Sequence, residues 1–68
     1  MKPDPGLHIT HLQTRIVMLR KEKYRLTRIA ADEYETTAAR IRAQDGALES
    51  SLAILKTEGV VRRLEANR

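Results

Sequence analysis

The chain carries one apolar stripe that repeats with the period of an α-helix over most of its length. Neighbouring members of the stripe are separated by three, four or seven residues. Because an α-helix has about 3.6 residues per turn, this spacing places the side chains on one helix face. The stripe consists of Leu12, Ile16, Leu19, Leu26, Ala30, Tyr34, Ala38, Ile41, Leu48, Leu52 and Leu55. It predicts helices that need a partner surface, and it does not identify the partner.

The length of the chain limits how much apolar surface it can bury. A chain of 68 residues forms one small domain, and a domain of this size buries only about 60% of the surface that its unfolded form exposes. Small domains usually gain further stability from disulfides, a metal or association with another chain. Cysteine is absent, which excludes disulfides, zinc fingers and thiol catalysis. Association therefore remains as the expected stabiliser.

The apolar residues favour an all-α fold. The sequence has no Phe, no Trp and two Tyr residues, so aliphatic side chains must form the core. Such a core suits narrow helix–helix contacts better than a ligand pocket, which is usually lined by aromatic side chains. We predict a two-helix antiparallel hairpin or coiled coil, and the alternative is one long helix in a coiled-coil oligomer. Residues 1–6 are expected to be a flexible lead-in and residues 7–66 a single helical domain.

Two sites for the start of the first helix and two for the turn remain open. Pro5 after Asp4 suits the first helical position, and Thr10 with Gln13 has the spacing of a capping box. A turn at Asp45–Gly46 would use the ability of glycine to end a helix. A turn at 31–35, where Asp32 and Glu35 have the spacing of a helix cap and its third-position acid, would give nearly equal arms that bury each other better.

The densest charge cluster lies in the first half of the chain. It is opposed by Glu22 alone and comprises Arg15, Arg20, Lys21, Lys23, Arg25 and Arg28. All except Lys23, which falls within the apolar stripe, are candidate phosphate contacts. The cluster has neither Asn nor Gln to read bases, and a single aromatic residue, Tyr24, to stack on them. We interpret it as a solvated helix surface, with a small basic dimeric nucleic-acid-binding protein as the alternative function.

Other polar groups offer little for metal binding or catalysis. His8 and His11 would share a helix face, but a zinc site needs further ligands. The acidic residues Asp32, Glu33 and Glu35 point in different directions on a helix, whereas hard cations need several converging oxygens. The hydroxyl pairs in the chain have no base beside them. We therefore expect a protein that is not an enzyme and has no catalytic site, metal, cofactor or small-molecule substrate.

Two polar residues occupy positions where the heptad pattern expects apolar ones. Lys23 and Asp45 fall in line with the apolar stripe. Buried polar residues at such positions lower stability but specify the register and the partner. One hypothesis is that the two residues pair across an antiparallel interface. The other is that both lie at its edge and extend to water.

The sequence also bears on the cellular compartment. The longest aliphatic run is residues 16–19, whereas about 20 apolar residues are needed to cross a bilayer. The first six residues lack the apolar core of a signal peptide. These features predict a cytoplasmic protein without a membrane partner.

A ten-residue stretch resembles a known family. Gly46-Ala47-Leu48-Glu49-Ser50-Ser51-Leu52-Ala53-Ile54-Leu55 is similar to the second helix of the small co-chaperones of type III secretion needle subunits. The resemblance implies a two-helix hairpin that binds a second, helical-repeat chaperone, so that the pair masks an aggregation-prone needle subunit. It also implies that Leu48, Leu52 and Leu55 line the helix contact. The basic cluster has no counterpart in this resemblance.

These features together predict a small, non-enzymatic helical interaction module of the adaptor or co-chaperone type. It would act by burying an aliphatic helix face against itself, as a homo-oligomer, or against a helical protein partner. The residues predicted to form the partner interface are Leu12, Ile16, Leu19, Leu26, Ile41, Leu48, Leu52 and Leu55.

Overall fold

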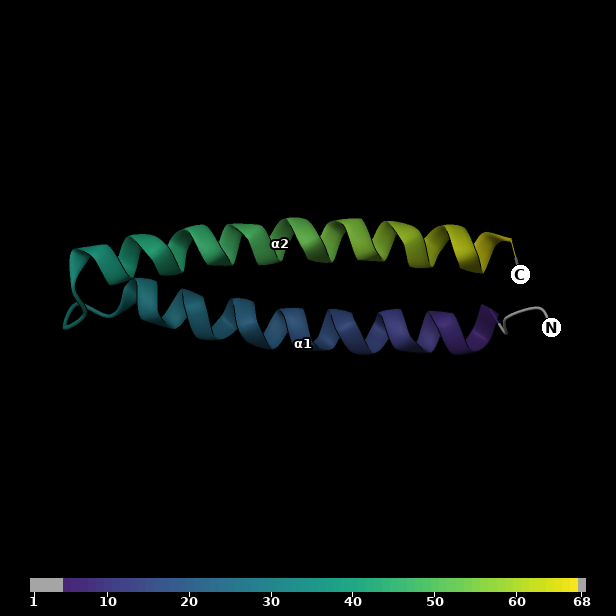
Figure 1. Ribbon diagram of the computed structural model, residues 1–68, viewed down its shortest axis with the longest axis horizontal. Coiled ribbons are helices and arrows are strands. Elements are labelled where there is room, and N and C mark those ends of the chain that lie inside the picture. Colours follow the sequence, from purple (N-terminus) through teal and green to yellow (C-terminus); the bar gives the residue numbers. More distant parts are fainter. Residues whose placement is uncertain (1–4, 68) are drawn as a thin grey trace.

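Two long helices lie side by side in a hairpin (Figure 1). A computed structural model describes residues 5–67, with α1 at Pro5–Ala31 and α2 at Thr37–Ala66. The helices run antiparallel and form a rod of 52 × 15 × 14 Å. The prediction of an all-α, two-helix antiparallel hairpin is confirmed, and the chain does not form one unbroken helix.

The first helix begins at the earlier of the two expected sites. Helix α1 starts at Pro5, whose restricted φ suits the first turn and whose missing N–H would have no partner there. Thr10 lies inside α1, and its hydroxyl donates to the carbonyl of Gly6 at 2.9 Å. The expected lead-in of residues 1–6 therefore overlaps the helix by two residues. Residues 1–4, including the proposed cap Asp4, lie outside the described part of the chain.

The chain reverses at residues 32–36, one of the two turn sites considered. The Asp32 N–H donates to the carbonyl of Ile29 at 3.1 Å, and the Asp32 carboxylate accepts from the Tyr34 N–H at 2.9 Å. This side-chain bond to a backbone N–H two residues later is a common way for aspartate to shape a turn. No residue in the described range has a positive φ. The reversal therefore needs no glycine, and Asp45–Gly46 lies within α2.

Bonds at the turn also fix the ends of the two helices. Thr36, and not Asp32, is the N-cap of α2, and its hydroxyl oxygen accepts from the Ala39 N–H at 3.1 Å. This bond satisfies one of the backbone donors that the first turn of a helix leaves unpaired. Arg40 Nε donates to the carbonyl of Ala30 at 3.0 Å, near the end of α1. The start of α2 is thereby tied to the end of α1.

The apolar core lies between the helices and is largest in the half of the hairpin away from the turn. Its buried members are Ile9, Ile16, Ile54 and Val61, with Leu12, Leu19 and Leu64 packed against them. Nearer the turn, α2 contributes the small buried residues Ala43 and Ser50. A Cβ added at Gly46 would lie 2.9 Å from Leu26 Cδ1. Small residues of α2 therefore make room for the larger side chains of α1 in this half.

Substitutions at Ile54 test the core between the helices. Ile54→Val should lower the free energy of unfolding by about 0.5–1.5 kcal/mol, and Ile54→Ala by about 2–5 kcal/mol, because each leaves unfilled space between the helices. Denaturant unfolding followed by circular dichroism measures both values. Met18→Ala is the matched control on an exposed side chain and should change the free energy by less than about 0.5 kcal/mol. Equal losses at the two positions would contradict the described core.

Candidate functional site

The predicted interface residues fall into two groups, and the group on α1 faces α2. Ile16 is buried, Leu12 and Leu19 pack against the core, and Leu26 is half-buried beside Gly46. These four side chains join the two helices of one chain. Their apolar surface is thus largely covered within the hairpin.

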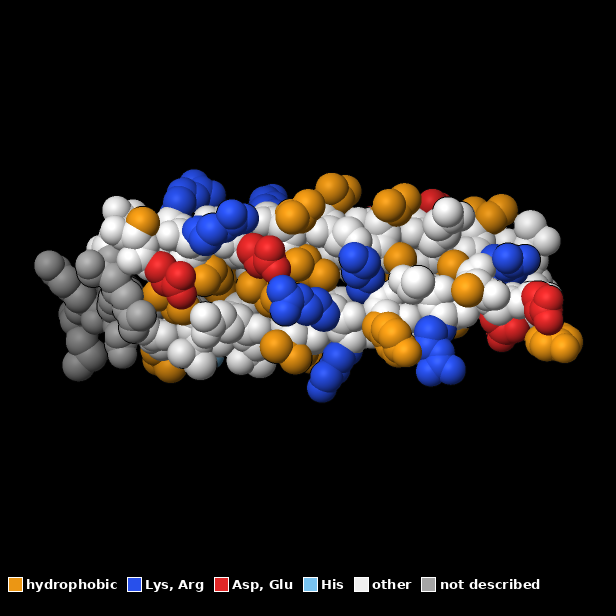
Figure 2. Space-filling view, turned by 180° about the vertical axis from the view of Figure 1, so that it is seen from behind, with side chains coloured by type: hydrophobic (Ala, Val, Ile, Leu, Met, Phe, Trp, Pro, Cys, Tyr) orange, Lys and Arg blue, Asp and Glu red, His pale blue; other side chains and the backbone are white. Residues whose placement is uncertain are grey.

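The group on α2 points the other way. Ile41, Leu48, Leu52 and Leu55 are 53%, 60%, 67% and 61% exposed. Within the hairpin this part of the stripe therefore does not contact α1, and its burial against another chain stays a prediction. Leu48, Leu52 and Leu55, which the family resemblance implies to line the helix contact, do not line the contact between α1 and α2. Figure 2 shows hydrophobic side chains along the edge of α2 that faces away from α1.

The contact with α1 uses a face of α2 that the stripe did not include. Its buried residues are Ala43, Ser50, Ile54 and Val61. They follow one another at seven, four and seven residues, which is also a helical spacing. Ala43 and Ser50 are small, so a search for large apolar side chains gives this face little weight. The recurrence of Ala, Gly and Ser at positions 39, 43, 46, 47 and 50 is the signal that would have revealed it.

Asp45 gives a physical reason for this choice of face. Turning the leucines of α2 toward α1 would also bring Asp45 into the contact, because it lies on the same stripe as Ile41 and Leu48. Burying an ionised carboxylate without a partner carries a large desolvation penalty. The observed contact has no ionisable residue among its buried members. The leucines therefore stay outside together with Asp45.

We call the exposed stripe of α2 the outer face; it consists of Ile41, Asp45, Leu48, Leu52, Leu55 and Gly59. Ile41, Leu48 and Leu52 each precede a buried residue of the α1 contact by two positions. Two residues correspond to about 200° around a helix, so the outer face lies opposite the contact with α1. Alternating steps of four and three residues make it a heptad seam without a partner in the hairpin.

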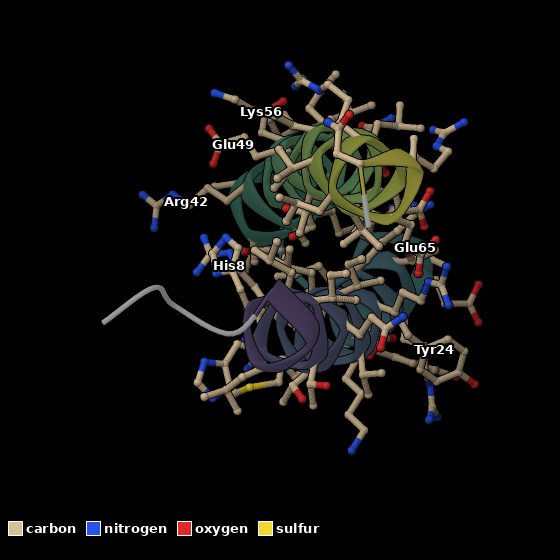
Figure 3. All side chains as sticks on the ribbon, turned by 90° about the vertical axis from the view of Figure 1, so that its right-hand side faces the viewer. His8, Tyr24, Arg42, Glu49, Lys56 and Glu65 are labelled. Carbon is tan, nitrogen blue, oxygen red and sulfur yellow. The ribbon has the colours of Figure 1, made fainter. Side chains whose placement is uncertain are left out.

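Charged side chains border the outer face on one side. Arg42, Glu49 and Lys56 each follow an outer-face residue by one position. Figure 3 shows these three side chains extending from the same side of α2. Residues on the opposite border are Gln44, Ser51 and Glu58, of which Glu58 already forms an ion pair with α1. The outer face is thus an aliphatic strip with a charged border and a mostly uncharged one.

The basic cluster of α1 is partly engaged within the chain. Arg20 forms an ion pair with Glu58 at 2.8 Å, and Arg25 forms one with Glu22 at 2.6 Å. The Arg28 guanidinium lies 5.9 Å from the centre of the Tyr24 ring, within range of a cation–π interaction.

The five candidate phosphate contacts lie on different sides of α1. Lys21, Arg25 and Arg28 are spaced by four and three residues and share one side of the helix. Arg20 lines a groove with Val17 and Val61, whereas Arg15 lines a different groove with His11 and Met18. The five side chains do not form one continuous basic surface.

The two polar residues of the stripe do not pair with each other. Lys23 and Asp45 are both exposed, and no ion pair joins them in the hairpin. Lys23 extends to water from the edge of the α1 contact. Asp45 lies on the outer face, where its role depends on what covers that face.

The described residues add two findings on metals and membranes. Across positions 5–67, no cluster of three or more His, Cys, Asp or Glu side chains is arranged to hold a metal ion. Neither α1 nor α2, over the same range, combines the length and apolarity needed to cross a membrane. Comparison with protein-family models, with curated proteins and with solved structures found no match to this chain.

A double-mutant cycle tests the ion pair that joins the helices. Arg20→Gln, Glu58→Gln and the double variant should give a coupling energy of about 0.2–1 kcal/mol, because both side chains reach solvent. Raising the salt concentration to about 1 M should reduce this coupling by screening. Arg25→Gln combined with Glu58→Gln is the control pair and should show no coupling. A salt-independent coupling at Arg20–Glu58 would contradict an ionic contact.

Proposed function

We propose that the protein is a non-enzymatic helical interaction module, of the adaptor or co-chaperone type, that binds through the outer face of α2. The contact between α1 and α2 holds the hairpin together, and the outer face binds another copy of the chain or a helical protein partner. In this arrangement the hairpin is the scaffold and α2 presents the binding side chains.

The exposed aliphatic row on α2 is the observation that carries this proposal. Four large aliphatic side chains, each more than half exposed, are aligned along one helix face. Single exposed apolar side chains are ordinary, but a contiguous apolar strip with a polar border is typical of an interaction site. Covering such a strip contributes about 25 cal/mol per Å² of apolar surface removed from water. An amphipathic helix whose residues recur at heptad spacing fits another helix best.

Affinity isolation with a pair of lysine variants tests the proposal. The tagged protein is isolated from cells that produce it, at moderate and at high salt, together with a differently tagged second copy. Leu52→Lys and Met18→Lys are matched because the two side chains are 67% and 66% exposed but lie on different helices. The wild type and Met18→Lys should retain a stoichiometric protein, either the second copy or another chain, through the high-salt wash. Leu52→Lys should lose it.

Two results would count against the proposal. Equal retention by Leu52→Lys and the wild type would show that the outer face is not the binding surface. Recovery of nucleic acid that leaves steeply with rising salt would instead favour the alternative function, in which the basic cluster of α1 contacts phosphates. Substitution of Lys21, Arg25 and Arg28, which share one side of α1, would then abolish that recovery.

A further inference from the structure

Asp45 places a carboxylate within the aliphatic row of the outer face. It is exposed and lies one helical turn from Ile41 on one side and from Leu48 on the other. In the described part of the chain its carboxylate forms no ion pair and accepts no hydrogen bond. A helix that covers the row also removes the solvent around this carboxylate, and an ionised group buried without a partner carries a large desolvation penalty. The occupant of the outer face therefore has to supply a group that pairs with Asp45.

We infer that this occupant is an amphipathic helix of a different protein, whose own apolar row carries one lysine or arginine at the level of Asp45. The inference rests on the proposed function, because it takes the outer face as the binding surface. The basic side chain donates a charge-assisted hydrogen bond to the carboxylate. Leucine or isoleucine residues of the same row cover Ile41, Leu48 and Leu52. A single charged position in such a row costs stability and specifies the partner.

The charged border of the outer face adds a second pattern to be matched. Arg42, Glu49 and Lys56 follow one another at intervals of seven residues, and all three are exposed. Neither ion pair among residues 5–67 includes any of them, and Figure 3 shows their side chains on the same side of α2. Opposite charges across a contact between helices select the partner and the register. The complementary helix therefore carries acidic, basic and acidic residues in turn along its facing border.

A second copy of this chain does not match the charged border when the leucines of the two outer faces are aligned. In the antiparallel register that packs Leu48 against Leu52, Glu49 comes level with Glu49 of the second copy. The same register brings Arg42 level with Lys56 of the second copy. Like charges therefore meet along the whole border, which opposes this pairing.

Other registers of a second copy fail at Asp45 or beside it. A parallel pair in register places Asp45 against Asp45, and two carboxylates at that distance repel each other. An antiparallel pair moved by one heptad sets Asp45 against Leu48 and leaves the carboxylate unpaired. Moved by one heptad the other way, it gives Asp45 the cation of Arg62 but sets Leu48 against Gly59. A helix of different sequence is needed to match the row, the carboxylate and the border together.

Two synthetic peptides that differ at one residue test the inference. Each peptide is about three heptads long and has a leucine row at heptad spacing, in which the position facing Asp45 is lysine in one peptide and glutamate in the other. Its border carries glutamate, lysine and glutamate to match Arg42, Glu49 and Lys56. Both peptides are made with the row in either order, so that parallel and antiparallel packing are sampled. Because the leucines are identical, the difference in affinity reports on the residue that faces Asp45.

The wild-type protein should bind the lysine peptide about 10-fold or more tightly than the glutamate peptide, because only lysine pairs with the carboxylate. Asp45→Lys should reverse this preference, and Asp45→Asn should largely abolish it. Glu33→Lys is the matched control, because it makes a similar change of charge in the exposed turn, and it should leave the preference unchanged. Isothermal titration calorimetry measures the affinities. Circular dichroism should show that every variant keeps the helical hairpin.

The outcomes separate this inference from the proposed function. Equal affinities for the two peptides, binding of neither peptide, or no reversal by Asp45→Lys each overturns the inference. A wild-type dimer in sedimentation equilibrium that Leu52→Lys abolishes also overturns it, because the occupant is then a second copy, while the interaction module still stands. The proposed function fails instead if Leu52→Lys retains the same protein as the wild type in the affinity isolation.

Discussion

The structure depends on a single layer of side chains between two helices. A hairpin of two helices has one internal contact, and each helix can present only one face to it. In α2 two faces carry apolar residues, and only one can be covered by α1. The face without an ionisable residue is covered, and the face that contains Asp45 stays in solvent. The penalty for burying a carboxylate therefore decides which leucines remain available.

Much of the fold follows from the sequence, because the features that determine it are local. The three- and four-residue spacing predicts helices, and the equal arms produced by a turn near residue 32 agree with the observed hairpin. The bonds of the turn are less predictable. Asp32 was expected to cap α2, but Thr36 does so, while Asp32 shapes the preceding reversal. Both residues have capping side chains, and the geometry of the turn decides between them.

The candidate site could be predicted only in part, for a reason that lies in α2. Leu48, Leu52 and Leu55 are large and apolar. A stripe drawn through large apolar residues therefore includes them and continues into α1. The contact with α1 instead needs small residues, because Leu26 requires space beside Gly46. Size complementarity between α1 and α2 depends on the side chains of both helices at once, and the periodicity of apolar residues along the sequence does not reveal it. The periodicity therefore singles out these leucines, but it does not show that they lie outside the contact with α1.

The offset between the two faces of α2 has a consequence for how such a chain can change during evolution. Three residues of the outer face each lie two positions before a buried residue of the contact with α1. Point substitutions can thus alter the outer face while the hairpin persists, since no residue belongs to both faces. Loss or gain of two residues inside α2, between Ile41 and Ile54, would instead place the two halves of each face on opposite sides of the helix, because two residues correspond to about 200°. The spacing of residues within α2 is therefore the feature of this hairpin on which selection should act most conservatively.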